Sequence, residues 1–66
     1  MKYYDIYVDE GKGFLDSLGY KIKRRTEAIE EANYLRSKYY SNGEPIEVCL
    51  ITKGVGTETC DTIAEI

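Results

Sequence analysis

One stretch near the middle of the chain constrains the fold more than any other, because it carries a helix start, a periodic apolar face and a helix stop. Thr26 is placed to cap the first turn, and Glu27 follows near the positive end of the helix dipole. Asn42-Gly43 and then Pro45 supply the stop. Apolar residues recur between these signals with the spacing of one helix face, namely Ala28, Ala32, Leu35 and Tyr39, widened by Ile29 and Tyr40. The sequence therefore predicts one amphipathic helix that begins at Thr26 and buries this face.

Alternating apolar and polar residues predict strands on both sides of this helix. The strand segments are residues 2–8, 20–24, 46–52 and 58–66. In the second segment, Tyr20 and Ile22 are expected to point inward, whereas Lys21 and Lys23 point outward. Residues 14–18, between the first two segments, are expected to form a packed loop or a single helical turn.

The order of these elements is strand, strand, helix, strand, strand, which predicts an α+β fold in one domain covering residues 1–66. We expect a four-stranded antiparallel sheet with the amphipathic helix packed on one face. One helix covers only one face of such a sheet. The uncovered face is expected to carry a mixture of tyrosines, charged residues and aliphatic residues, namely Tyr3, Asp5, Tyr7, Lys21, Lys23, Glu47, Cys49, Ile51 and Ile63.

The register of the last hairpin decides where the two cysteines lie. A two-residue Gly54-Val55 loop would place Cys49 opposite Cys60. A three-residue loop that also includes Gly56 would instead turn Cys60, Ala64 and Ile66 toward the core. The second register buries more apolar groups, and glycine suits the left-handed position in its loop. It predicts Cys60 inside, Cys49 outside and both thiols free.

The residue types needed for most catalytic and metal sites are absent. The chain has no histidine, which removes the commonest general base and metal ligand, and its two cysteines cannot supply a tetrahedral zinc site. The segment GVGT at residues 54–57 lacks the pattern of a phosphate loop and is followed by a strand. We therefore expect a protein that is not an enzyme and that has no catalytic residues, no cofactor and no metal.

Charge and hydropathy limit the kinds of partner. Nine basic and twelve acidic residues give a net charge of −3, which weakly opposes non-specific attraction to nucleic acid. No apolar run of about twenty residues is present to span a membrane, and the first residues lack the apolar segment of a secretion signal. These features predict a cytoplasmic protein with no membrane partner.

The uncovered sheet face is the candidate interaction surface. Exposed tyrosines and isoleucines with mixed charge are typical of protein interfaces, and a domain this small gains from pairing with a partner or with a second copy of itself. The interaction face is predicted to consist of Tyr3, Tyr7, Lys21, Lys23, Ile51 and Ile63.

Weak binding of single-stranded nucleic acid is the alternative function for this face. Tyr3 and Tyr7 could stack on bases while Lys21, Lys23 and Arg25 contact phosphates, although the sequence has none of the motifs of RNA-recognition sheets.

The order of motifs resembles a broad group of known proteins. The chain opens with YYDIYVDEGKG, follows Thr26 with Glu-Ala, continues its helix with Ala-Asn-Tyr-Leu-Arg, and then has an Asn-Gly turn and a closing hairpin. In this it resembles small strand-strand-helix-strand-strand proteins encoded by bacteria and their phages, most of which have no known function. Some small acidic phage proteins of similar size inhibit host defence complexes by binding them. The resemblance implies action by contact and transfers no catalytic or binding residues.

Overall fold

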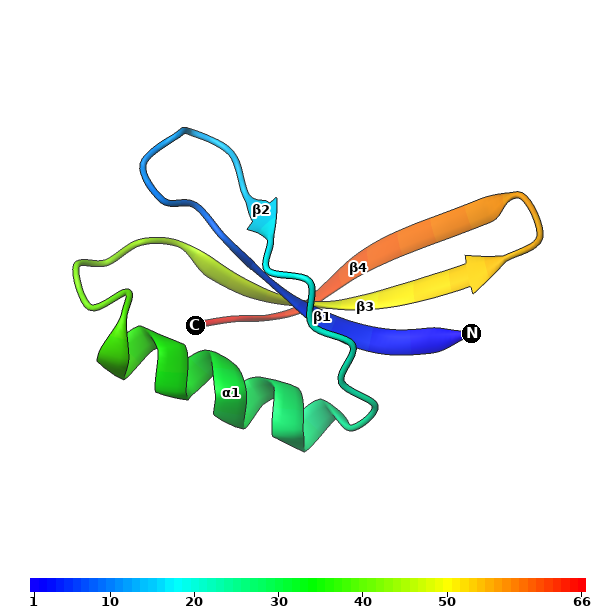
Figure 1. The fold of residues 1–66 in the computed structure, drawn as a ribbon, viewed down its shortest axis with the longest axis horizontal. Coiled ribbons are helices and arrows are strands. Elements are labelled where there is room, and N and C mark those ends of the chain that lie inside the picture. Colours follow the sequence, from blue (N-terminus) through cyan, green and yellow to red (C-terminus); the bar gives the residue numbers. More distant parts are fainter.

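One antiparallel sheet and one helix form the molecule in the computed structural model, which describes residues 1–66 (Figure 1). The elements in chain order are β1 (Lys2–Val8), β2 (Asp16–Ser17), α1 (Arg25–Lys38), β3 (Ile46–Gly54) and β4 (Thr57–Glu65). The strands lie in the order β2-β1-β3-β4, and every neighbouring pair is antiparallel. The predicted α+β fold, with four antiparallel strands and one helix, is confirmed.

The helix begins slightly earlier than predicted. Arg24, in an extended conformation, occupies the cap position and makes no side-chain cap hydrogen bond, so Thr26 lies inside the first turn. The predicted Thr26 cap is therefore wrong. The preceding residues explain the difference, because Ile22 is held to β1 by an isolated bridge to Tyr4, and the chain turns into the helix directly after leaving that edge.

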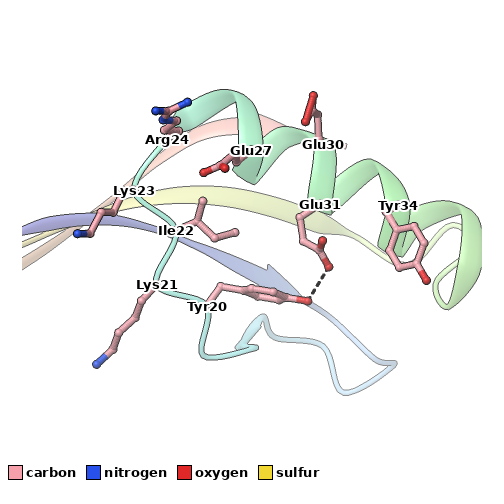
Figure 2. A pocket seen from close by; sticks show the side chains of 9 residues that line it. All are labelled: Tyr20, Lys21, Ile22, Lys23, Arg24, Glu27, Glu30, Glu31 and Tyr34. Carbon is pink, nitrogen blue, oxygen red and sulfur yellow. Dashed lines mark hydrogen bonds between the residues drawn. The ribbon is translucent and has the colours of Figure 1, made fainter.

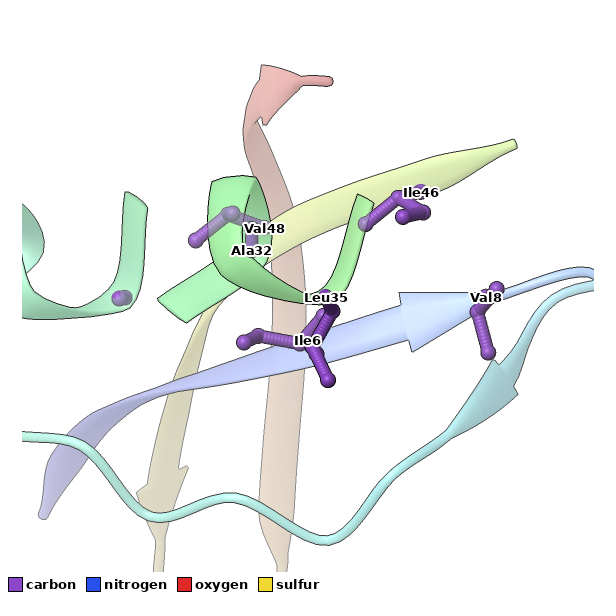
Figure 3. Close-up of a cluster of buried hydrophobic side chains, with 7 residues drawn as sticks. Ile6, Val8, Ala32, Leu35, Ile46 and Val48 are labelled. Atoms are coloured by element: carbon purple, nitrogen blue, oxygen red, sulfur yellow. The ribbon is translucent and has the colours of Figure 1, made fainter. Parts of the chain in front are cut away.

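The predicted helix face forms the centre of the hydrophobic core (Figure 3). Ala28 and Ala32 are fully buried, and their small side chains let the helix backbone lie close to the sheet. Tyr39 is the exception, at 66% exposed: it is the C-cap residue of α1, and its ring lies edge-on to the exposed ring of Tyr34. The seven core residues come from α1, β1 and β3, namely Ile6, Val8, Ala28, Ala32, Leu35, Ile46 and Val48.

The predicted second strand, residues 20–24, is replaced by a short strand and a separate bridge. Ser17 pairs with Tyr7, and Ile22 exchanges two backbone hydrogen bonds with Tyr4, of 2.7 and 3.0 Å. Ser17 and Ile22 are five residues apart, but their partners Tyr7 and Tyr4 are only three residues apart. The two extra residues form a bulge around Gly19 that interrupts the strand pairing. The φ of Gly19 is +79°, a conformation that glycine adopts readily. The prediction of a loop or helical turn at residues 14–18 was wrong over β2.

The β3–β4 hairpin has neither of the two registers considered from the sequence. Its turn is Val55-Gly56, closed by the pair Gly54 and Thr57. This turn places Cys60 opposite Ile51, so that Cys60 is exposed on the side of the sheet away from α1. Cys49 is buried on that same side, and both thiols are free. The predicted face is therefore right for Cys49, although its thiol is buried there, and wrong for Cys60, whereas the absence of a disulfide agrees with the prediction.

A β-bulge then corrects the register toward the end of β4. Cys49 pairs with Thr62 but Val48 pairs with Ala64, so Ile63 is an extra residue in β4. The shift brings Ala64 and Ile66 against the core, as predicted. Without the bulge, the register that starts from the Val55-Gly56 turn would direct Ala64 and Ile66 away from the core.

The helix leaves large parts of the sheet uncovered. It packs against β1 and β3, while the outer half of the β3–β4 hairpin extends past it (Figure 1). The face opposite α1 has no second layer, and β4 forms a free edge of the sheet.

Candidate functional site

The side of the sheet away from α1 carries a compact group of aromatic, aliphatic and sulfur-containing side chains. Alternation along the strands places these residues on the same side, since Tyr3 pairs with Ile51 and Ile51 pairs with Cys60. We call this group the open face. Its members are Tyr3, Tyr7, Cys49, Ile51 and Cys60.

The centre of the open face is already well packed. Tyr3 is 9% exposed, and Cys49 and Ile51 are each 3% exposed, so these three form a second small hydrophobic cluster. Tyr7 packs against this cluster and is only partly buried. Tyr3 and Ile51 therefore offer a partner much less surface than the sequence prediction implied, whereas Tyr7 and Cys60 remain accessible.

The phenol of Tyr7 is held protonated well beyond neutral pH. Partial burial is the main cause and raises its pKa to about 12, and the neighbouring Cys60 thiol and Asp5 carboxylate add to the effect. A protonated phenol on an apolar ring combines a hydrogen-bond donor with a large contact area. Tyr7 is therefore suited to bind a partner that offers both an apolar surface and an acceptor.

The buried thiol of Cys49 is unsuited to nucleophilic chemistry. Burial raises its pKa to about 11, although a weak contact with Thr62 acts in the opposite direction. The Cys49 Sγ lies 3.8 Å from Thr62 Oγ1, and that hydroxyl donates a hydrogen bond of 2.8 Å to Glu47. At neutral pH Cys49 is therefore a protonated packing residue.

Asp5 lies beside the open face and is only 4% exposed, which for a carboxylate calls for an explanation. Its Oδ1 accepts backbone N–H groups from Ile6 at 2.7 Å and from Tyr20 at 2.8 Å, and its Oδ2 accepts the hydroxyl of Ser17. Ser17 and Tyr20 lie on the two sides of Gly19, where the ladder between β2 and the Ile22 bridge is broken. Asp5 therefore substitutes for the missing ladder and ties residues 17–20 to β1. Alternation in the sequence gave no signal for this role.

The predicted basic residues Lys21 and Lys23 lie at the β1 edge of the open face. Ile22 shares the helix side of the sheet with Tyr4, so the two lysines on either side of it point away from α1 (Figure 2). Both are exposed, and neither forms an ion pair. The structure thus brings Lys21 and Lys23 to the same side as Tyr3, Tyr7 and Ile51.

An open groove separates this basic segment from the first turns of α1 (Figure 2). Its helix wall is acidic, with Glu27, Glu30 and Glu31. Tyr20 spans the groove and donates a hydrogen bond of 2.8 Å to Glu31. Burial and this carboxylate raise the pKa of Tyr20 to about 12. The groove presents both signs of charge, and this bond is the one side-chain hydrogen bond across it. The bond holds residues 20–24 against the helix.

Lys53 closes the other end of the open face, which the sequence analysis did not anticipate. Its Nζ lies 5.6 Å from the centre of the Tyr3 ring and 3.4 Å from the carboxylate of Glu58. These two neighbours raise the pKa of Lys53, with Tyr3 the larger cause. The interaction covers the Tyr3 ring and helps to explain its burial.

Ile63 does not belong to the open face as predicted. It packs instead against the main core beneath α1. The cause is the hairpin turn at Val55-Gly56, because its register places Thr62 opposite Cys49 on the open face and the next residue, Ile63, therefore faces α1.

Neither similarity to known proteins nor a second kind of site identifies a function for this chain. No family model, curated protein or solved structure matches the chain. No three histidine, cysteine, aspartate or glutamate side chains come together in a way that could hold a metal ion. The single helix is too short and too polar to cross a bilayer.

Proposed function

We propose that this chain is a non-enzymatic protein-interaction module that binds its partner through the open face, with Tyr7 at the centre of the contact. Lys21 and Lys23 flank that contact at the β1 edge. The partner is another protein or a second copy of the chain. We place the module in the cytoplasm, where free thiols such as Cys49 and Cys60 persist.

The observation that supports this proposal is the position of Tyr7. Its ring packs on the cluster of Tyr3, Cys49 and Ile51, yet no element of the fold lies over it. A tyrosine supported from beneath is largely fixed before binding, so it loses little conformational freedom when a partner packs against it. Such supported aromatic residues are the ones that contribute most binding energy in protein interfaces.

A matched pair of tyrosine substitutions tests the proposal. The immobilised wild-type chain, Tyr7→Ala and Tyr39→Ala would be used to capture proteins from a bacterial extract, a source chosen because the sequence resembles small bacterial and phage proteins. Tyr39 is an exposed tyrosine beyond the end of α1, so it controls for loss of a surface phenol. We expect Tyr39→Ala to retain the captured protein and Tyr7→Ala to lose it.

Self-association would be measured on the same three proteins by sedimentation over a concentration series. A dimer that Tyr7→Ala disrupts and Tyr39→Ala does not would make a second copy the partner. If Tyr7→Ala matches the wild type in both capture and self-association, the open face is not the interaction surface.

Binding of single-stranded nucleic acid is the competing candidate, favoured by the exposed and unpaired cations Lys21 and Lys23. The burial of Tyr3 weighs against it, because only Tyr7 is left to stack on a base. The competing function predicts that a labelled oligothymidylate binds with an affinity that falls steeply as salt is raised, and that Lys21→Glu with Lys23→Glu abolishes this binding. Absence of salt-sensitive binding would exclude it.

A further inference from the structure

The outer edge of β4 is the longer of the two free edges of the sheet, since β4 has nine residues and the other edge strand, β2, has two. β4 is the last strand in the order β2-β1-β3-β4, so only one of its two edges has a partner. In an antiparallel pair, successive residues turn their backbone groups alternately toward the partner and away from it. The two-residue turn fixes this alternation, since Gly54 and Thr57 form its hydrogen-bonded closing pair. Glu58, Cys60 and Thr62 therefore direct their N–H and C=O groups outward.

Nothing in the molecule covers this edge. All side chains from Thr57 to Thr62 are exposed, and the outer half of the β3–β4 hairpin extends beyond α1 (Figure 1). The strand is regular over this length, because the β-bulge occurs only afterwards, at Ile63. An extended segment could thus add to the sheet here without rearrangement of the hairpin.

The charge of β4 selects the kind of segment. The strand TETCDTIAE carries Glu58, Asp61 and Glu65 and has no basic residue. Glu58 is paired with Lys53, but Asp61 and Glu65 form no ion pair. Opposite charges on adjacent strands stabilise their pairing and like charges oppose it.

We propose that the outer edge of β4 binds an extended basic peptide segment of a partner protein by strand addition. Backbone hydrogen bonds to Glu58, Cys60 and Thr62 supply the pairing. Lysine or arginine side chains on the two faces of the segment lie beside Asp61 on the helix side of the sheet and beside Glu65 on the open side. A second copy of β4 is disfavoured as the occupant because it would bring these acidic side chains together.

Both proposals rest on the premise that the chain acts by binding protein. They differ in the binding surface, which is the outer edge of β4 here and the open face in the proposed function. Tyr7→Ala and substitutions at Asp61 and Glu65 therefore test the two proposals separately.

The test uses a synthetic ten-residue peptide of lysine, valine and threonine with lysines at both odd and even positions, so that both faces of the strand carry positive charge, together with a control peptide that has glutamate in place of lysine. Binding to the full chain would be measured by fluorescence anisotropy. We expect binding of the lysine peptide only, and about tenfold or greater weakening in the double variant Asp61→Lys, Glu65→Lys. The double variant Glu27→Lys, Glu30→Lys has the same net charge and alters exposed helix residues, so it should bind like the wild type.

Amide hydrogen exchange would show directly whether the peptide pairs with the backbone of β4. The outward amides of Glu58 and Cys60 should become protected when the lysine peptide binds, while those of α1 stay unchanged. Equal binding of both peptides, equal weakening by the helix variant, or protection elsewhere would overturn the proposal. Self-association of the free chain that disappears in Asp61→Lys, Glu65→Lys would also overturn it, since the occupant would then be a second copy.

Discussion

Replacing Asp5 by alanine should remove the contact that holds residues 17–20 to the sheet. The substitution deprives two backbone N–H groups, those of Ile6 and Tyr20, of their acceptor, while the exposed Ser17 hydroxyl can turn to water. Each buried donor left unpaired costs about 1–3 kcal/mol. Because the Ile6 donor is buried and the Tyr20 donor is only partly buried, the second cost lies at the low end of this range, and we expect the free energy of unfolding to fall by about 2–4 kcal/mol.

That loss is large for a domain of this size. At roughly 0.05–0.15 kcal/mol per residue, the whole chain is stable by only about 3–10 kcal/mol. The melting temperature should fall by about 8–32 °C, given about 4–8 °C per kcal/mol in small domains. Urea denaturation would measure the free energy of unfolding, and amide exchange would locate the loosened segment at residues 17–22.

Asparagine at the same position provides the matched control. Its Oδ1 can still accept the N–H groups of Ile6 and Tyr20, and its amide can donate to Ser17 Oγ, so only the charge is lost. We expect Asp5→Asn to cost about 1 kcal/mol. The reasoning would be refuted if Asp5→Ala unfolded within about 0.5 kcal/mol of the wild type, or if the two variants were equally destabilised.

Three further predictions follow from the packing and the pKa shifts. Ala32→Leu should overpack the contact between α1 and the sheet and lower the free energy of unfolding by about 1–3 kcal/mol in urea denaturation; an unchanged value would contradict the assigned helix face. Iodoacetamide at pH 7.5 should modify Cys60 and spare Cys49 in the folded protein, because burial raises the Cys49 pKa to about 11, and mass spectrometry of the peptides would reveal the reverse order if it occurred. The pKa of Tyr20 is about 12 in the folded protein and close to 10 when unfolded, so its contribution to stability is intact below pH 10 and is lost as pH rises from 10 to 12. Tyr20→Phe should therefore lose less stability than the wild type between pH 10 and 12, and parallel pH profiles would count against this assignment.

The parts of the fold set by simple periodicity could be predicted from the sequence. The spacing of Ala28, Ala32 and Leu35 identified the buried helix face, and alternation located β1, β3 and β4 to within a few residues. These predictions succeed because buried side chains recur about every 3.6 residues in a helix and every second residue in a strand.

The features missed were those in which one or two residues break that repeat. The Val55-Gly56 turn sets a hairpin register that neither sequence alternative had, which put Cys60 on the open face and Ile63 on the helix side of the sheet, and the bulge at Ile63 then keeps Ala64 on the helix side as well. The break around Gly19 is compensated by Asp5, a contact between residues fifteen apart that no local pattern encodes.

For the candidate site, the sequence predicted which residues share one side of the sheet, but not how deeply they are buried. Tyr3, Tyr7, Lys21, Lys23 and Ile51 do share one side of the sheet. The burial of Tyr3 and Ile51 could not be foreseen, because it depends on Lys53 lying over the Tyr3 ring and on the packing of Tyr7 across strands.

The strand order also determines when the sheet can be completed during folding. The hairpin of β3 and β4 joins residues that are close in sequence, whereas β1 pairs with β3 across 37 intervening residues at the near end, Val8 and Ile46, and 49 at the far end, Lys2 and Thr52. Contacts between distant residues form later because the chain must first close the loop between them. Until β1 docks, the inner edge of β3 is exposed as well as the outer edge of β4, so the hairpin is most open to pairing with other chains early in folding.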